Sequence, residues 1–413
     1  MLWFKYVSIV LLGIQAWRPK YYFASLCSLF IAALYYALSF PRLANHSVLE
    51  FFTIAAVFFG LAWFVLFRKK LFPTPLTPTI FRLTLISIYW YAGFHKLNAD
   101  YFNLQTSCAI SINDLIIDFA TQTLELKRNL VLKTLIVATF IVEMIVPFGL
   151  LFKNFRKSAA VILLLFHTYL SIRVFADFSS FAVFLLAGCL LDFSDKPLDK
   201  SIIRSFKIYS SLVIVAVLIE TLLTVQAVPK TTSTIVHGLI YTIGVLFLFI
   251  SIFRTETIAY RISNSQRVAL LCIPLAVTIW SIRPYFGLGN TANLTMFSNL
   301  ITEKSRSNHF LIATNQTKIT NWEEDYVEIV QMPNELKSEK LEGYLLPKQE
   351  LAVLLRYYAT RFPKDKLPAV LIYRGKKIDI PDLKTSAFAE YKRYYKYVFF
   401  RRIPKEGPCP CLW

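Results

Sequence analysis

The sequence predicts an all-α polytopic membrane bundle with about nine or ten transmembrane helices, followed by a small extracytoplasmic α+β cap. The 413 residues are 56% hydrophobic, and the mean hydropathy is +0.50. Only 17% of the residues are charged, against about 25% in soluble domains. The long apolar runs stop near residue 286, and charged residues become frequent beyond it. We therefore expect a transmembrane helical domain at 1–286 and a cap at 287–413.

Each predicted span is an apolar run close to the ~20 residues that cross a bilayer. Leu2–Trp17 either spans or lies at the interface, and Ser180–Leu191 either spans or forms half of a broken pair. Alternate loops carry about 15 and about 5 Lys and Arg, so the richer set is cytoplasmic by the positive-inside rule. The cap then lies on the outer side. The candidates are Leu2–Trp17, Tyr21–Phe40, Phe51–Phe67, Ile80–Lys96, Leu130–Phe152, Ser158–Phe175, Ser180–Leu191, Tyr209–Val228, Ile235–Phe253 and Val268–Pro284.

The cap is predicted to mix short strands with helices. Runs of β-branched and aromatic residues predict strands at His309–Thr314, Tyr326–Met332 and Pro368–Tyr373. Helical periodicity predicts helices at Gln349–Arg361 and Lys384–Tyr397. Prolines separate these elements, as expected for a small α+β domain.

Charge and cysteine content exclude several classes of protein. We attribute the net charge of +19 to cytoplasmic loops and contact with membrane lipids, since no aromatic–basic module typical of nucleic-acid binding is present. No zinc-type spacing occurs, and no metal site is predicted. Cys27, Cys189 and Cys272 lie in apolar runs and are interpreted as small buried hydrophobes. Cys409-Pro410-Cys411 is interpreted as an inert tail, with metal binding or thiol exchange as alternatives.

The candidate site begins where an apolar run, Ile80–Phe94, meets His95-Lys96-Leu97-Asn98-Ala99-Asp100. Ionisable side chains at the end of a span are costly to bury and often mark a functional site. A lysine in an apolar pocket has a lowered pKa and can act as a general base. The alternative, which spacing alone slightly favours, is a cation that snorkels to the interface. Lys96 and Asp100 would pair if the helix continued.

Three more ionisable residues fall in the predicted spans. Glu143 and His167 lie mid-span, and Arg173 follows toward the predicted outer side. A buried histidine is most often only hydrogen-bonded, and Glu143 could serve only as a partner for Lys96 or His167. However, Lys96, His167 and Arg173 fall at compatible depths, which favours a single pocket.

Three stretches resemble the HTTM family, which is related to vitamin K-dependent γ-glutamyl carboxylase. Ala92-Gly93-Phe94-His95-Lys96-Leu97-Asn98-Ala99-Asp100 resembles the family signature. Met296-Phe297-Ser298-Asn299-Leu300, with Thr302-Glu303 and Ser307-Asn308-His309, resembles a second family stretch. The ending, Phe399-Phe400-Arg401 and then Gly407 to Trp413, is similar to the ends of bacterial members. The resemblance implies a multi-pass protein of a bacterial inner membrane.

The resemblance also implies a reaction. In the carboxylase, the signature lysine deprotonates vitamin K hydroquinone, and the anion reacts with oxygen to form a stronger base. That base removes a γ-proton from glutamate, and carbon dioxide adds to the carbanion. We therefore expect a quinone-linked enzyme with vitamin K hydroquinone or another membrane quinone as cofactor. A peptide or protein would be the substrate.

The resemblance assigns Lys96 as the base, with His95 or His167 orienting it or relaying protons. Asn299, Glu303 and His309 are expected to close the pocket from above. The predicted substrate-binding residues are Asn98, Asp100, Glu143, Arg173, Asn299, Glu303 and His309.

Two departures limit what the resemblance implies. The tail, at about a hundred residues, is far shorter than the lumenal part of the animal enzyme. Thr168-Tyr169-Leu170 does not reproduce the carboxylase pattern after His167. The alternative function is a non-catalytic membrane scaffold or assembly factor, with Lys96 and Asp100 as a structural pair. A transporter is a third class, but no matching pair of interrupted helices supports it.

Overall fold

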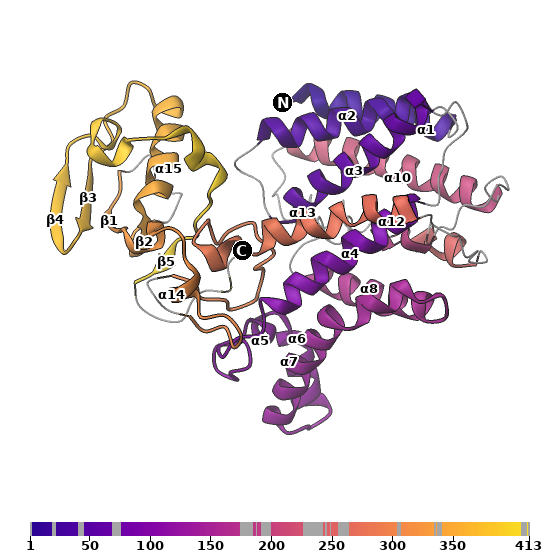
Figure 1. Ribbon diagram of the computed structural model, residues 1–413, viewed down its shortest axis with the longest axis horizontal. Helices are drawn as coiled ribbons and strands as arrows, with labels where there is room; N and C mark the ends of the chain where they lie inside the picture. Colours follow the sequence, from indigo (N-terminus) through magenta and orange to yellow (C-terminus); the bar gives the residue numbers. More distant parts are fainter. Residues whose placement is uncertain are drawn as a thin grey trace. The chain divides into compact units, whose positions relative to one another are not determined.

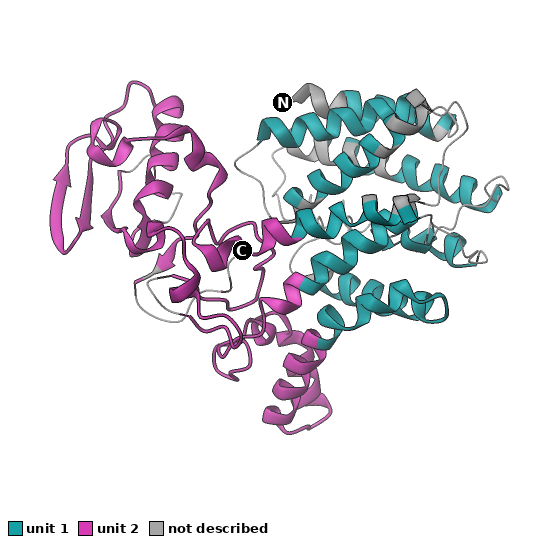
Figure 2. Cartoon of the chain, viewed as in Figure 1, with its two compact units in different colours: residues 1–39, 46–90, 141–277 teal, residues 40–45, 91–140, 278–413 magenta. Residues whose placement is uncertain are grey.

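The computed structural model forms two compact units (Figures 1 and 2). Unit 1 contains residues 1–39, 46–90 and 141–277, and unit 2 contains residues 40–45, 91–140 and 278–413. Unit 2 therefore joins the C-terminal region to residues from the middle of the chain. The structure describes residues 2–18, 22–39, 45–67, 76–173, 185–186, 188–190, 200–225, 243, 246–247, 249–254, 264–303, 307–333, 336, 341–405 and 411.

Unit 1 is helical in its described part. The longest described helix, α10, carries Lys200, Arg204 and Lys207 in its first turns, while Ile202 and Phe206 between them join the hydrophobic core. Two helices, α4 and α13, begin in unit 1 and end in unit 2. The elements are α1 (Leu2–Trp17), α2 (Tyr22–Ser39), α3 (Asn45–Phe67), α4 (Leu76–Phe94), η2 (Val146–Leu151), α8 (Lys153–Arg173), α10 (Lys200–Val225), α12 (Asn264–Leu270) and α13 (Cys272–Ser281).

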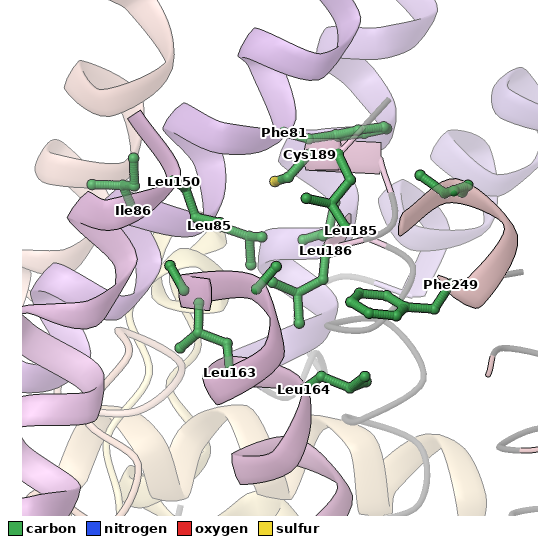
Figure 3. Packing of buried hydrophobic residues seen from close by; sticks show 14 of the residues in the cluster. Phe81, Leu85, Ile86, Leu150, Leu163, Leu164, Leu185, Leu186, Cys189 and Phe249 are labelled. Atoms are coloured by element: carbon green, nitrogen blue, oxygen red, sulfur yellow. The ribbon is translucent and has the colours of Figure 1, made fainter. Parts of the chain in front are cut away.

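The core of unit 1 joins α4 to α8 (Figure 3). Leu85 and Ile86 of α4 share one buried cluster with Leu163 and Leu164 of α8. In each helix the buried positions also recur three or four residues apart, Phe81 with Leu85 in α4 and Ala160 with Leu163 and Leu164 in α8, as expected for amphipathic helices packing together. The cluster is completed by Phe81, Leu150, Leu185, Leu186, Cys189 and Phe249, among others.

The prediction of an all-α polytopic membrane bundle is wrong. Among the described residues, one helical stretch, Arg128–Leu151, has the length and hydropathy of a membrane span. Shorter apolar helical stretches, of 10–17 residues, occur there at Phe23–Ser39, Glu50–Phe59 and Cys272–Ser281. Lys153 and Arg156, which the prediction assigned to a loop, lie inside α8 and shorten its apolar run. Much of Ser180–Leu191 and Ile235–Phe253 lies outside the described residues.

The C-terminal part of unit 2 is built on an antiparallel sheet of five strands in the order β4-β3-β1-β2-β5. The central strand β1 pairs Val327 with Tyr373 of β3 and with Leu346 of β2. A bulge interrupts the β1–β3 register between Ile329 and Gln331. The strands are β1 (Tyr326–Gln331), β2 (Tyr344–Pro347), β3 (Ala369–Tyr373), β4 (Lys376–Ile380) and β5 (Ile403–Pro404).

One helix, α15 (Lys348–Arg361), packs on this sheet (Figure 1). Its buried Leu351 and Leu355 join Val327 and Leu371 of the sheet in one hydrophobic cluster. The alternating burial of β1 supplies the sheet side of this core. The shorter elements of unit 2 are α5 (Cys108–Ile112), α6 (Asp114–Asp118), η1 (Phe119–Thr123), η3 (Arg283–Phe286), α14 (Thr314–Thr317), η4 (Trp322–Glu324), η6 (Leu383–Thr385), η7 (Ala387–Ala389) and η8 (Arg393–Tyr397); α7 (Arg128–Met144) begins there.

The strands predicted at Tyr326–Met332 and Pro368–Tyr373 and the helix at Gln349–Arg361 are confirmed by β1, β3 and α15. The strand predicted at His309–Thr314 is wrong, because the His309 ring accepts hydrogen bonds from the backbone just after it and turns the chain. The helix predicted at Lys384–Tyr397 is also wrong. Extended backbone at Ser386 (ψ 162°) and Lys392 (ψ 140°) divides it into short 3-10 segments.

Truncation of Leu163 to Ala is expected to lower the free energy of unfolding by about 2–5 kcal/mol, because it leaves a cavity between α4 and α8. Leu165→Ala is the matched control on the same helix, since this side chain is 64% exposed. It should change stability by less than about 0.5 kcal/mol. Thermal unfolding followed by intrinsic fluorescence compares the two variants. Equal effects would contradict the packing described.

Candidate functional site

The C-terminal end of α4 lies in unit 2 and has its backbone carbonyls satisfied. The last four carbonyls of a helix lack partners within the helix. The His95 N–H donates to Tyr91 O and the Lys96 N–H donates to Gly93 O, each at 3.0 Å. These bonds extend α4 into the turn that carries the two predicted catalytic residues.

Side chains satisfy the other carbonyls at this end. Lys96 Nζ donates to Ala92 O at 3.3 Å, and His309 Nε2 donates to Phe94 O at 3.0 Å. Lys96 Nζ also lies 3.4 Å from Met296 O, on a loop two hundred residues further along. The amine of Lys96 therefore sits at the C-terminal, negative end of the helix dipole, among backbone acceptors.

Lys96 is enclosed, with 2% of its surface exposed. Its Nζ lies 5.8 Å from the centre of the Tyr101 ring, which presents a π face to the amine. The predicted pair with Asp100 required a helix that continues, but α4 ends at Phe94. Asp100 Oδ2 instead accepts a hydrogen bond from Asn308 Nδ2 at 2.8 Å.

His95 is fully buried and both ring nitrogens are engaged. Its Nε2 lies 3.1 Å from Asn293 O, and its Nδ1 lies 2.8 Å from the Tyr285 hydroxyl. A backbone carbonyl only accepts, so Nε2 carries the proton. In the neutral ring, Nδ1 then accepts from Tyr285. His95 thereby ties the end of α4 to η3 and to the loop that follows it.

His309 is held in a single tautomer by the backbone. Its Nδ1 accepts from the N–H groups of Leu311 and Ile312, each at 3.2 Å, while Nε2 donates to Phe94 O. Burial lowers the pKa of His309, and the bond to Phe94 opposes that change. These hydrogen bonds are those of a neutral imidazole ring. In the structure, His309 caps the C-terminal end of α4.

A fully buried asparagine links the signature segment to the loop after α13. Asn98 Nδ2 donates to His95 O at 2.8 Å and to Ser298 O at 2.6 Å, while its Oδ1 accepts from the Tyr101 N–H at 2.9 Å. Losing such a buried amide would strand several backbone groups, at about 1–3 kcal/mol each. Asn98 is therefore held as a backbone connector.

Two further asparagines continue this network. Asn308 Nδ2 donates to Asn299 O at 2.7 Å, and its Oδ1 accepts from the Ile301 N–H at 2.8 Å. Asn299 Oδ1 accepts from the Cys108 N–H, and its Nδ2 donates to Thr106 O, both at 2.8 Å. The predicted site residue Asn299 therefore joins the loop to the segment that enters α5.

The loop itself carries unusual backbone angles. Ala292, Leu294, Phe297 and Asn299 have φ values of 61°, 65°, 48° and 56°, in the left-handed region. Such residues cost roughly 1–2 kcal/mol each when they are not glycine. Strain of this kind persists only where surrounding contacts impose it, and it gathers at functional sites. We call residues 287–303 and 307–309 the capping loop.

Glu303, a predicted substrate-binding residue, lies in a buried ionic cluster. It accepts hydrogen bonds from Asn290 Nδ2 and the Thr302 N–H, each at 2.9 Å, and pairs with Arg401 Nε. Burial alone would raise the pKa of Glu303, but Arg401 and these hydrogen bonds hold it below its ordinary value. Its carboxylate is thus an ionised anchor for the C-terminal segment.

A second carboxylate shares this cluster. Glu323 is fully buried, accepts from Asn290 Nδ2 at 3.2 Å, and pairs with Lys318 Nζ at 3.0 Å. Burial first, and then the charge of Glu303, raises the pKa of Glu323 to about 7, although Lys318 opposes this. Two neighbouring carboxyl groups therefore have pKa values shifted in opposite directions.

The remaining predicted residues lie outside unit 2. His167, on α8, is 1% exposed and hydrogen-bonds through Nε2 to the Tyr89 hydroxyl. Glu143, near the end of α7, is also buried in unit 1. Arg173 ends α8, and its side chain is outside the described part. Because Lys96 belongs to unit 2, a pocket shared with His167 stays a prediction.

The cysteine interpretations need correction. Cys411 forms a disulfide with Cys108, 303 residues earlier, so it is not part of an inert tail. Cys409 lies outside the described residues. Cys189 is buried as predicted, whereas Cys27 is half-buried and Cys272 is exposed. In the described part of the chain, no group of three or more His, Cys, Asp or Glu could hold a metal ion.

Several residues that build the site were not predicted, among them Tyr285, Asn290, Asn293, Glu323 and Arg401. The asparagines and Tyr285 lie near a resembled stretch but have no distinctive spacing, while Glu323 and Arg401 are far from it in sequence. Comparisons with known protein families, curated proteins and solved structures gave no match. The resemblance to the HTTM family therefore stays a prediction.

The raised pKa of Glu323 makes the stability of unit 2 depend on pH. The folded state, with a pKa of about 7, holds this proton more tightly than the unfolded chain, whose pKa is about 4.3. The stabilisation is complete below the unfolded pKa and is lost as pH rises through about 7, at up to about 1.4 kcal/mol per pH unit.

Glu323→Gln should therefore flatten the fall in stability between about pH 5 and pH 7. Glu324→Gln is the matched control, because Glu324 is next in sequence but exposed. This variant should keep the fall in stability. Thermal unfolding measured across this pH range tests both variants. If the stability of Glu323→Gln fell with pH as steeply as that of the wild type, the raised pKa of Glu323 would be contradicted.

Proposed function

We propose that the chain is a quinone-linked enzyme in which Lys96 Nζ acts as general base, as the resemblance to the HTTM family implies. One observation carries the proposal: an amine that is 2% exposed is held between Ala92 O and Met296 O, beneath a strained loop. General bases gain effect when the surrounding protein excludes water and fixes their direction.

An aromatic reactant that carries hydroxyl groups would meet aromatic and polar partners near His95. Phe94 and Tyr285 pack edge to face against each other there, with ring centres 5.9 Å apart. Two fully buried oxygens, Asn293 Oδ1 and Ser281 Oγ, have no hydrogen-bond partner among the described residues. A buried acceptor without a donor costs about 1–3 kcal/mol, and a reactant hydroxyl donating to Asn293 Oδ1 would relieve that cost.

A bound hydroquinone would supply a phenolic hydroxyl and two reducing electrons. Lys96 Nζ accepts the hydroxyl proton, so the amine becomes an ammonium and the reactant becomes an anion. A neutral amine has two N–H donors and one lone pair, and Ala92 O and Met296 O can take both donors and direct the pair. His95 positions the capping loop through Asn293 O and Tyr285.

The location and partners follow from this proposal. A quinone partitions into lipid, and Arg128–Leu151 supports attachment to a membrane. The Cys108–Cys411 disulfide supports an oxidising, extracytoplasmic compartment for unit 2, such as the outer face of a bacterial inner membrane. The complete reaction that we propose is carboxylation of glutamate in a peptide or protein substrate.

A non-catalytic scaffold or assembly factor is the second candidate function. It is favoured by the capping geometry, since Lys96, Asn98 and His309 all bind backbone carbonyls at or just beyond the end of α4. A charged lysine at that end stabilises a helix without any reaction. Unit 2 would then serve as a surface for a partner protein.

Lys96→Arg separates the two functions. Arginine keeps the charge and can cap carbonyls, but it does not release its proton in proteins. If Lys96 is a base, Lys96→Arg and Lys96→Met should both lose about 100-fold or more of the activity. The assay follows consumption of added phylloquinol under oxygen by chromatography, above a protein-free blank, and Lys127→Met is the exposed control.

Thermal unfolding of each variant accompanies the assay. An inactive but folded Lys96→Arg variant, beside an active Lys127→Met variant, supports the base. Two results would contradict it: wild-type protein that consumes phylloquinol no faster than the blank, or Lys96→Arg that is as active as wild type. A Lys96→Met variant that unfolds while Lys96→Arg stays folded would favour the scaffold.

A further inference from the structure

The positive charge of the C-terminal region is concentrated in one short segment. Residues 287–413 contain 20 Lys and Arg and 14 Asp and Glu. Residues 391–405 hold six of the basic residues and none of the acidic ones. The rest of the region is balanced, with 14 residues of each sign. The whole excess of positive charge therefore falls in this segment.

The fold places part of this charge on one turn. Residues three apart lie above one another in a 3-10 helix, about 6 Å apart along the axis. In η8, this spacing aligns Arg393 with Lys396 and Tyr394 with Tyr397. We call Lys392, Arg393, Tyr394, Lys396 and Tyr397 the η8 strip. It presents a pair of cations beside a pair of phenol rings.

The cations of the η8 strip are weakly neutralised by the protein. Lys392 and Arg393 are exposed, and neither forms an ion pair with a described residue. Lys396 lies 4.8 Å from the centre of the Tyr397 ring, which leaves its charge uncompensated. Glu390 is the acidic residue that precedes the strip, and exposed Arg356, over the Tyr391 ring, adds another cation. Like charges in register repel unless an anion joins them.

The tyrosines of the strip are exposed but held in place. Tyr394 is 46% exposed and Tyr397 is 51% exposed. The Tyr394 ring stacks on Trp322, with centres 5.9 Å apart and planes 25° apart. Tyrosine rings with an apolar body and a polar tip suit the head-group level of a bilayer.

Apolar surface adjoins the strip within unit 2. Arg283 donates to Tyr397 O and lies 4.3 Å from the centre of the Trp280 ring, which precedes it at the end of α13. Ile279, next to Trp280, is 59% exposed. The end of α13, which carries exposed Ile279, therefore lies near the cations and rings of the strip, as in proteins that contact a membrane surface.

We propose that the η8 strip binds the head groups of anionic phospholipids. Arg393 and Lys396, one turn apart on η8, would share one phosphodiester, with the tyrosines beside it at the level of the glycerol. Anionic surfaces attract each nearby Lys or Arg, and salt weakens this attraction. The inference does not depend on Lys96 or on the reaction proposed for it.

The same observations disfavour other polyanions. Single-stranded nucleic acid requires exposed ring faces for base stacking, but Tyr394 stacks on Trp322 and Lys396 lies over the Tyr397 ring. An acidic peptide would gain nothing from the exposed Ile279, whereas a lipid surface offers its acyl region to that side chain. A phospholipid is therefore the partner that fits the charge and the apolar neighbour together.

The test is native mass spectrometry of the full chain in neutral detergent, titrated with phosphatidylglycerol or phosphatidylcholine. The wild-type protein should bind phosphatidylglycerol about tenfold more tightly or better, with the preference falling as salt rises. Replacement of Lys392, Arg393 and Lys396 by Gln should remove most of that preference. The control replaces exposed Lys364, Lys366 and Lys377 by Gln, which removes the same charge elsewhere in unit 2.

Loss of preference in the η8 triple variant alone supports the proposal. Equal loss in both triple variants would overturn it, because net charge would then be responsible. Retained preference in the η8 variant would also overturn it. Displacement of phosphatidylglycerol by a single-stranded oligonucleotide, a glutamate-rich peptide or inorganic phosphate, at a lower concentration than by phosphatidylglycerol itself, would assign the strip to that ligand instead.

Discussion

The buried C-terminal end of α4 is the constraint on which the site in unit 2 depends. A helix that ends away from water must find donors for its last carbonyls. Here Lys96 and His309 donate to Ala92 O and Phe94 O, and Asn98 continues the pattern at His95 O. The predicted site residues Lys96, Asn98 and His309 are therefore also the residues that cap the C-terminal end of α4.

The capping loop can adopt its strained shape because the C-terminal segment fixes it. Phe399 O accepts from the Asn290 N–H at 2.8 Å, and Arg401 pairs with Glu303. Gly289 has a φ of 107°, and a Cβ there would lie 2.6 Å from Phe399 O, so glycine is required at this crossing. The Cys108–Cys411 disulfide ties the end of this segment to the region of α5. The position of Met296 O against Lys96 thus depends on residues about a hundred positions away.

Part of the candidate site could be predicted from the sequence, but its surroundings could not. Lys96 was found because an amine directly follows a long apolar run, and β1, β3 and α15 were found from regular hydrophobic periods. Glu323 and Arg401 could not be found, since each reaches the cluster only through tertiary folding. The disulfide joins residues 303 positions apart, and no local pattern encodes that pairing. The membrane bundle was wrong because hydropathy does not reveal where helices end or that basic residues lie within them, as in α8.

The enclosure of Lys96 is tested most directly by its rate of acylation. The native full chain is treated briefly with acetic anhydride, and modification of each lysine is measured by peptide mass spectrometry. Lys96 should react far more slowly than exposed Lys127, and Asn308→Ala, which loosens the capping loop, should raise the Lys96 rate while leaving the Lys127 rate unchanged. Equal rates for Lys96 and Lys127 in the wild-type protein would contradict a buried amine and, with it, the proposed base.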